Sequence, residues 1–157
     1  MDLLSDELFS VPAAGHALTV IIRVVAAALL GAVIGGEREL EGKAAGLRTH
    51  MLVSLGAALF VIAPREAGLR AGELANIVQG VAAGIGFIGA GTILKLAERE
   101  TIKGLTTAAS IWMTAAIGIA AGIGPLWVSV LSAACAWVTL AVFARVEKSL
   151  STNANRP

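Results

Sequence analysis

The 157-residue sequence has little of what most soluble proteins use for their surface and their chemistry. Charged residues make up 15% of the chain, aromatic residues make up 4%, and Cys135 is the single cysteine. One cysteine excludes a disulfide framework and a cysteine-based metal site, so we interpret Cys135 as a small packing residue. The net charge is +1, and no basic stripe is interleaved with aromatic residues. The sequence therefore gives no indication of nucleic-acid binding.

Apolar residues are in excess. They account for 57% of the chain, and the mean hydropathy is +0.82. The 18 glycines lie mainly within apolar runs, which is typical of membrane helices whose backbones pack closely. The acidic N-terminus lacks the positive region of a cleaved signal peptide, so we expect the first helix to remain in the mature protein. These features predict an all-α polytopic membrane protein with glycine- and alanine-rich packing.

Five segments are apolar enough to cross a hydrocarbon core of ~30 Å, which takes about 20 helical residues. They are residues 17–36, 47–63, 74–95, 104–121 and 125–144. The second segment ends at Pro64, and Gly122-Ile-Gly-Pro125 separates the last two. We predict a five-helix transmembrane domain at residues 17–144, an extracytoplasmic N-terminal segment at 1–16 and a short cytoplasmic tail at 145–157.

The distribution of positive charge orients this domain. Three Lys or Arg residues lie in each of the loop 37–48, the loop 95–103 and the tail, whereas the opposite side carries Arg65 and Arg70. The positive-inside rule therefore places the N-terminus outside and both loops and the C-terminus in the cytoplasm.

The two predicted hairpins share a pattern. Glu37-Arg38-Glu39, Lys43 and Gly46-Leu-Arg-Thr49 follow the first span, and Glu98-Arg99-Glu100, Lys103 and Gly104-Leu-Thr-Thr107 follow the third. A parallel duplication of one helical hairpin would produce this similarity, and chance is the alternative.

Glycines predict where helices pack. Gly84-Ile-Gly-Phe-Ile-Gly89 fits the G-x-G-x-x-G pattern, but it lies within a span rather than after a strand, so we interpret it as a packing surface and not as a nucleotide site. Several glycines share one helical face and would form a groove for a neighbouring helix. The glycines predicted to pack are Gly31, Gly35, Gly80, Gly84, Gly86, Gly89 and Gly91.

Arg23 is the one charged residue well inside a predicted span, about 9 Å from its outer end. Asn76 and Gln79 lie at a similar depth in the third span. Two interpretations remain open: a polar cluster of these three side chains, or an Arg23 side chain that extends to the outer headgroups.

Glu37 lies at the membrane boundary directly after Gly35-Gly36, where a carboxylate needs a partner. The cations available to it are Arg48, Lys95 and Lys103. We expect residues 35–50 and 95–107 to form one cytoplasmic surface, with threonines available to cap the following helices. A solvated turn is the plainer alternative. Direct binding of Mg²⁺ is a further alternative, with Glu37 and Glu41 as its candidate ligands.

Residues that carry enzyme chemistry are scattered. His16 and His50 lack a second histidine at a metal-binding spacing, so we expect both at the membrane interface. Asp2 and Asp6 are predicted on the opposite face from His50, which leaves no Ser-His-Asp arrangement. We expect no enzyme activity and no cofactor.

Three stretches resemble, in order, the conserved blocks of the MgtC/SapB membrane-protein family. They are GERELEGKAAGLRTHMLVSLGAAL, QGVAAGIGFIGAGTIL and GLTTAASIWMTAAIGIAAG. The resemblance implies a five-helix protein of the bacterial inner membrane that is linked to growth in low magnesium. It also implies action on other membrane proteins, including the F-type ATP synthase, rather than magnesium transport. Many members carry a soluble domain after the fifth helix, where this chain has residues 145–157.

The positions that the resemblance carries over are Glu37, Arg38, Gly46, Arg48, Thr49, His50, Gly84, Gly86, Gly89, Gly91, Thr106 and Thr107. A transporter or channel for Mg²⁺ or another small ion is the alternative function. Every Asp and Glu lies at a boundary or outside the spans, which weakens a carboxylate site at the midplane, although backbone carbonyls could line a pore. Besides the lipid bilayer, the expected partners are other membrane proteins or a second copy of the chain.

Overall fold

The computed structural model describes residues 14–96 and 101–154 and is dominated by five long helices. These are α2 (Ala14–Leu40), α3 (Leu47–Glu66), α4 (Ala71–Ala90), α5 (Leu105–Ile123) and α6 (Leu126–Ala154). Strands β1 (Leu94–Leu96) and β2 (Thr101–Lys103) form a small antiparallel hairpin between α4 and α5. All five helices are long and apolar enough to cross a membrane. The predicted all-α, five-helix membrane architecture is confirmed.

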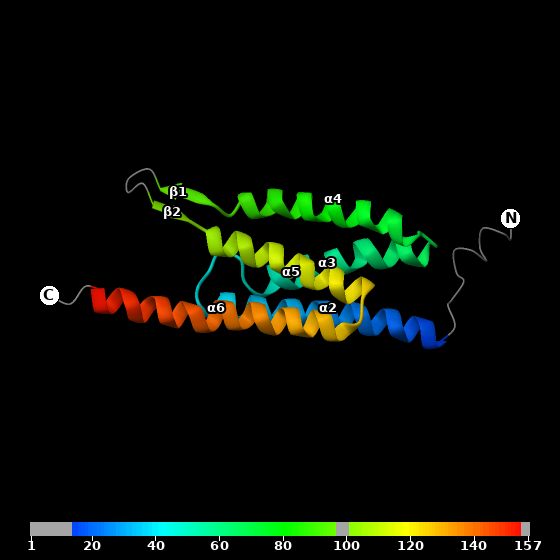
Figure 1. Cartoon of the computed structure of the whole chain (residues 1–157), viewed down its shortest axis with the longest axis horizontal. Coiled ribbons are helices and arrows are strands. Elements are labelled where there is room, and N and C mark those ends of the chain that lie inside the picture. Colours follow the sequence, from blue (N-terminus) through cyan, green and yellow to red (C-terminus); the bar gives the residue numbers. More distant parts are fainter. Residues whose placement is uncertain (1–13, 97–100, 155–157) are drawn as a thin grey trace.

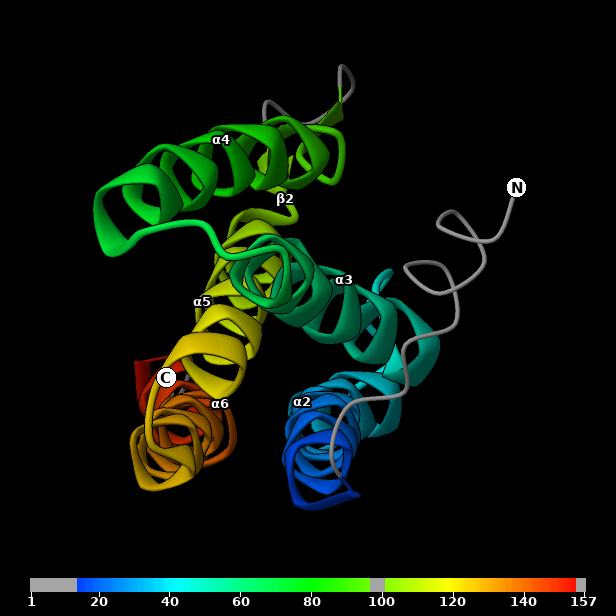
Figure 2. The same ribbon diagram turned by 90° about the vertical axis from the view of Figure 1, so that its right-hand side faces the viewer.

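The helices lie along one common axis. Helices α2, α4 and α6 run in one direction and α3 and α5 in the other (Figure 1). Viewed from the end, α3 and α5 occupy the centre, with α2 and α6 on one side and α4 on the other (Figure 2). Helix α2 packs along α3 and also touches α5 and α6, while α4 packs along α5. The bundle therefore has a central pair of helices covered unequally on its two sides.

The tightest packing lies between α2, α3 and α5, where glycines allow backbones to touch. A Cβ atom on Gly31 would lie 2.6 Å from the carbonyl oxygen of His50, and one on Gly35 would lie 2.7 Å from the Cα of Leu47. A Cβ on Gly118 would overlap the carbonyl oxygen of Ser54. Only glycine fits at such contacts, so these residues set the spacing of the three helices.

The glycines of α4 have a different environment. A Cβ on Gly80, Gly84 or Gly86 would meet no atom within 4 Å. A Cβ on Gly89 would make an ordinary contact with Ala108, and one on Gly91 would lie 3.3 Å from the carbonyl oxygen of Ile88, which is slightly tight. The helix predicted to use glycines for packing therefore leaves three of them open within the described chain.

Helix α4 ends earlier than predicted, at Ala90 rather than residue 95. The N–H of Gly91 donates to the carbonyl of Phe87, and the hydroxyl of Thr92 donates to the carbonyl of Gly89 at 2.7 Å. The β-branched residues Thr92 and Ile93 then lead into β1, which suits an extended backbone. Gly104 follows β2 with φ 93°, a left-handed conformation that glycine adopts without strain.

The other four helices run further than predicted, α5 by two residues, to Ile123. Helix α2 continues past residue 36 to Leu40, so Glu37-Arg38-Glu39 lie on its last turn. Helix α3 includes Pro64 and ends at Glu66. Helix α6 continues to Ala154 through the region expected to be a tail. None of the residues from Arg145 to Ala154 is glycine or proline, so nothing local breaks that helix.

Candidate functional site

The candidate site is centred on the last turn of α2, where two charged neighbours are buried together. The Arg38 residue is 2% exposed, and the Glu37 side chain is 9% exposed. Nη2 of Arg38 donates to Oε1 of Glu37 at 2.8 Å, and Nε donates to Oε2. This two-point ion pair matches the planar guanidinium to the planar carboxylate, which is the arrangement that best stabilises a desolvated charge.

Glu39 ties α2 to the start of α3. Its Oε2 accepts the backbone N–H of Leu47 at 2.7 Å, so a negative charge satisfies one free amide at the positive end of α3. Gly46 precedes Leu47 with an extended backbone, and a Cβ there would overlap Oε2 of Glu39. A side chain at this position would therefore displace the Glu39 carboxylate from the amide of Leu47. Thr49 makes no cap, which differs from the expectation that a threonine would do so.

His50 is fully buried and joins α3 to α5. Nδ1 lies 2.9 Å from the carbonyl oxygen of Gly46, and Nε2 lies 3.1 Å from Oγ of Ser110. Since a carbonyl only accepts, Nδ1 carries a proton in this arrangement. The Ser110 hydroxyl also lies 2.8 Å from the carbonyl of Thr107. The Ser110 hydroxyl donates to the carbonyl of Thr107 when Nε2 of His50 is protonated. It donates to Nε2 when the His50 ring is neutral. His50 is a buried core residue, whereas the sequence predicted an interfacial one.

The basic residues predicted to bind Glu37 are not seen to do so in the described part of the chain. Arg48 and Lys103 are exposed, and Glu37 pairs with Arg38 instead of either. The side chain of Lys95 lies outside the described part of the chain, as do Glu98, Arg99 and Glu100. The reason is local geometry: Arg38 lies on the bundle-facing side of α2, and the carboxylate within its reach belongs to its neighbour. The α2–α3 loop and the β-hairpin do lie at the same end of the bundle (Figure 1).

No metal-ligand set is present among the described residues, since no three His, Cys, Asp or Glu side chains gather there. Glu37 is engaged by Arg38, and Glu41 is exposed at the start of the loop. The two candidate cation ligands are therefore not brought together with a third. Thr106 is exposed, and Thr107 is buried beside Ser110.

At the opposite end of the bundle, Arg23 binds the end of α5. Its Nη1 donates to the carbonyls of Ala121 at 3.3 Å, Gly122 at 2.8 Å and Gly124 at 3.0 Å. Arg65 from α3 donates to the carbonyl of Ile123 at 2.9 Å. The last carbonyls of a helix lack partners within the helix and carry partial negative charge. Two arginines from two other helices thus satisfy the end of α5.

The predicted cluster of Arg23 with Asn76 and Gln79 is not formed. Both amides are exposed on α4, which lies on the far side of α3 and α5 from α2 (Figure 2). Arg23 finds backbone carbonyls instead, because Gly122 and Gly124 leave them uncovered by side chains. His16 lies near this end and forms a 2.5 Å contact with Glu66, which joins the N-terminal end of α2 to the C-terminal end of α3.

Comparison with known protein families identifies the family of the chain. The model of the MgtC family matches residues 24–149, which extend from α2 into α6. The chain belongs to the MgtC family. With five apolar helices and this membership, it is a multi-pass bacterial membrane protein.

Three MgtC-family relatives show how much of the chain is shared. Protein SrpB of Synechococcus elongatus is 41% identical over 145 residues, which cover 85% of this chain and 80% of SrpB. The putative magnesium transporter YhiD of Escherichia coli K12 is 42% identical, with 78% of this chain and 60% of YhiD covered. Protein MgtC of Salmonella typhimurium is 41% identical, with 66% and 43% covered. No solved structure matches.

Sequence reasoning missed a set of small polar residues in this MgtC-family bundle. Ser54 and Thr114 are fully buried, one turn along their helices from His50 and Ser110. The hydroxyl of Thr114 donates to the carbonyl of Ser110, whereas Oγ of Ser54 has no partner within the described chain. The i, i+4 spacing of His50 with Ser54 and of Ser110 with Thr114 was the available signal.

Proposed function

We propose that this chain is a non-catalytic protein of the bacterial inner membrane that supports growth in low magnesium by binding and regulating other membrane proteins. The N-terminus lies outside in this proposal, so the end of the bundle that holds Glu37 and Arg38 faces the cytoplasm. The surface around that end is the docking face.

One observation carries the proposal. Two acidic groups at this end are used internally, since Glu37 binds Arg38 and Glu39 binds the amide of Leu47. Around them, Leu40 is 91% exposed, and Lys43 and Arg48 are exposed as well. We call Leu40, Lys43 and Arg48 the outer rim. An exposed leucine flanked by cations suits contact with an apolar and acidic protein surface better than coordination of a cation.

The link to magnesium comes from the relatives. YhiD of Escherichia coli is named a putative magnesium transporter, and the chain is 41% identical to Protein MgtC of Salmonella over 104 residues. The F-type ATP synthase is the first partner to test, because the family resemblance implies it.

Transport of Mg²⁺ or another small ion is the second candidate, and one observation favours it. Ser54 has a buried hydroxyl without a partner in the described chain, and it lies at the junction of α2, α3 and α5 beside Gly31 and Gly118. Its neighbours along the same helices are the polar residues His50 and Thr114. Buried polar residues of this kind could line a path for an ion through the bundle.

Charge reversal on the outer rim tests the regulator. In cells that depend on this protein for growth in low magnesium, Arg48→Glu should abolish that support and the co-purification of the F-type ATP synthase. Arg145→Glu is the matched control, because Arg145 is also exposed and basic, and it belongs to the C-terminal half of α6, which extends to the same end of the bundle (Figure 1). Equal loss with both variants contradicts a specific docking face at the outer rim.

Flux measurements test the transporter. Purified protein in liposomes that enclose a Mg²⁺-sensitive dye should give no Mg²⁺ entry above that of empty liposomes. A protein-dependent flux that Ser54→Ala abolishes would replace the regulator with the transporter as the function of this chain.

A further inference from the structure

The neighbour relations of the helices repeat across the bundle. Helix α2 packs on α3 and touches α5, and α4 packs on α5 and touches α3. Exchanging α2 with α4 and α3 with α5 therefore preserves these contacts. The direction of each helix is preserved as well, because α2 and α4 run in parallel and α3 and α5 run against them (Figure 1). The four helices have the arrangement expected of two hairpins related about an axis along the bundle.

Helix α6 breaks this relation. It packs against α2 and α5. Under the same exchange, the equivalent position is the one beside α4 and α3. In the end-on view, α6 lies on one side of the central pair, and no helix of the described chain covers the equivalent position beside α3 and α4 (Figure 2).

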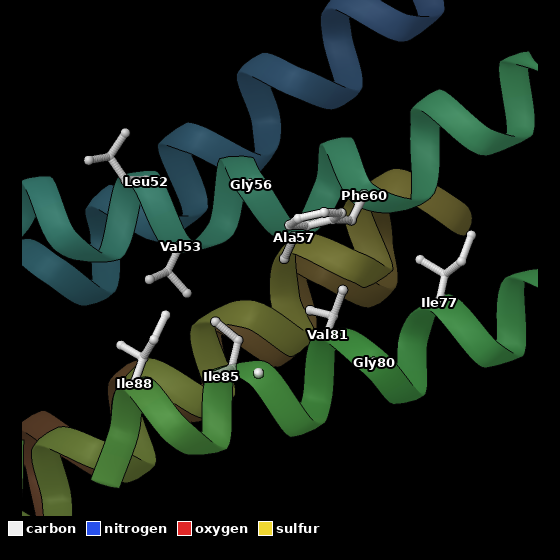
Figure 3. A pocket seen from close by; sticks show the side chains of 11 residues that line it. Leu52, Val53, Gly56, Ala57, Phe60, Ile77, Gly80, Val81, Ile85 and Ile88 are labelled. Atoms are coloured by element: carbon white, nitrogen blue, oxygen red, sulfur yellow. The ribbon is translucent and has the colours of Figure 1, made fainter. Parts of the chain in front are cut away.

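That equivalent position is a groove. A cavity of about 590 Å³ lies between α3 and α4, with apolar side chains along both walls. Val53 and Phe60 reach into it from α3, and Val81 and Ile88 reach into it from α4 (Figure 3). The lining of α4 extends from Ile77 to Ile88, which is about 16 Å of helix. That length allows another helix to make contact over three turns.

The groove is deep because glycines line both of its walls. Gly56 of α3 and Gly80 and Gly84 of α4 line it, and a Cβ on any of them would meet no atom within 4 Å. Where helices of this chain pack in full, as at Gly31 and Gly118, a Cβ would collide with the neighbouring helix. The groove therefore has glycines of the kind that allow a helix to pack closely, but no helix of the described chain packs against them.

Helix α4 also has the smallest buried share of the five apolar helices. Among its described residues, Leu74, Ile85 and Gly89 are buried, whereas nine residues of α5 are buried. The occupant of the groove would run in the same direction as α6, because the exchange preserves direction. Helix α4 of a second copy in the same membrane orientation meets this condition and carries the same open glycines.

We propose that the groove between α3 and α4 holds α4 of a second copy, and that each copy inserts its α4 into the groove of the other. Four helices, α3 and α4 of each copy, then form the interface of a parallel homodimer with two-fold symmetry. Helix α6 of the second copy is not the occupant. It lies across the molecule from the groove (Figure 2), so its insertion would be a head-to-tail contact, which gives a ring or an open chain of copies and not a two-fold pair.

Cross-linking of the full-length chain in liposomes tests the contact directly. In a Cys135→Ser background, Gly84→Cys should form a disulfide-linked dimer at a protein-to-lipid ratio low enough to suppress random collisions. Gly86→Cys is the matched control, because Gly86 is equally open but does not line the groove. It should give no dimer above the level of a cysteine-free chain.

Filling the groove is the second measurement. Gly84→Leu should raise the dissociation constant of the dimer in liposomes, measured by energy transfer between labelled copies, by about tenfold or more. Gly86→Leu should leave it unchanged. Monomers at every protein-to-lipid ratio overturn the proposal and leave lipid chains as the occupant. Cross-links from Gly84→Cys to α6 of another copy, or recovery of another protein on Gly84→Cys in native membranes, also overturn it.

Discussion

At the scale of single residues, the buried charges of this chain are stabilised by partners that sequence spacing does not indicate. Glu37 and Arg38 are adjacent, and neighbours on a helix normally diverge around its axis. The sequence therefore pointed to Arg48, Lys95 and Lys103 as partners for Glu37. The long Arg38 side chain instead turns its guanidinium to the carboxylate beside it. Arg23 likewise binds backbone carbonyls, which no side-chain pattern reveals.

The first prediction concerns the buried ion pair. Glu37→Gln leaves the guanidinium of Arg38 buried without a counter-charge, which should lower the free energy of unfolding by about 3–5 kcal/mol. The double variant Glu37→Gln/Arg38→Gln should lose less, because no uncompensated charge remains. Unfolding in mixed detergent micelles measures both.

Arg48→Gln is the control for this prediction, since Arg48 is exposed and does not contact Glu37. It should change the unfolding free energy by no more than about 0.5 kcal/mol. If Arg48→Gln costs as much as Glu37→Gln, the pairing with Arg38 is not what stabilises this end of the bundle.

The second prediction concerns the cap of α5. Arg23→Leu leaves the carbonyls of Gly122 and Gly124 without their donor, which should cost about 1–3 kcal/mol of unfolding free energy. Asn76→Leu and Gln79→Leu are the controls, because both amides are exposed on α4. Their unfolding midpoints should stay within error of the unsubstituted chain. A loss with Asn76→Leu equal to that with Arg23→Leu would restore the polar cluster suggested by the sequence.

At the scale of the helices, hydropathy predicted the number and rough position of every span, because crossing a membrane requires a long apolar segment. The ends could not be predicted, since contacts between elements set them. Helix α3 begins where Glu39 of α2 satisfies the amide of Leu47, and α4 ends where Gly91 and Thr92 turn the chain toward a strand. Glycine spacing alone did not separate Gly31, which packs against α3, from Gly84, which stays open.

The third prediction uses that difference. Gly118→Ala places a Cβ onto the carbonyl oxygen of Ser54, so α3 and α5 must separate, at a cost of about 1–3 kcal/mol of unfolding free energy. Gly86→Ala meets no neighbour and replaces the poorest helix former after proline, so it should be neutral or stabilising by up to about 1 kcal/mol. Thermal unfolding in one detergent compares the two. A lower midpoint for Gly86→Ala than for Gly118→Ala would contradict the packing described here.

At the scale of the whole molecule, the sequence predicted the class of the fold but not which helices are neighbours. Charge repeats suggested two related hairpins, and the contacts of α2, α3, α4 and α5 agree with that relation. Nothing in the spacing of apolar residues indicated that α3 and α5 form the centre. Most residues of a membrane helix are apolar on every side, so periodicity carries little information about which face is buried.

The fourth prediction is the orientation in the membrane. In a Cys135→Ser background, Lys43→Cys in the α2–α3 loop and Ala67→Cys just after α3 place single thiols at opposite ends of the bundle, and both positions are exposed. A membrane-impermeant maleimide added to intact spheroplasts should label Ala67→Cys only, since nine of the basic residues are expected in the cytoplasm. Labelling of Lys43→Cys alone would invert the topology.

The position of α6 has a consequence for the growth of assemblies. Two hairpins without a fifth helix would present the same groove on both sides, and each copy could then accept a neighbour at either side and extend as a filament in the membrane plane. Helix α6 packs along α2 and α5 on one side, so of the two equivalent positions only the one beside α3 and α4 stays open among the described helices. A protein with one reciprocal contact site stops growing at two copies. In the proposed dimer, the fifth helix therefore prevents further copies from adding.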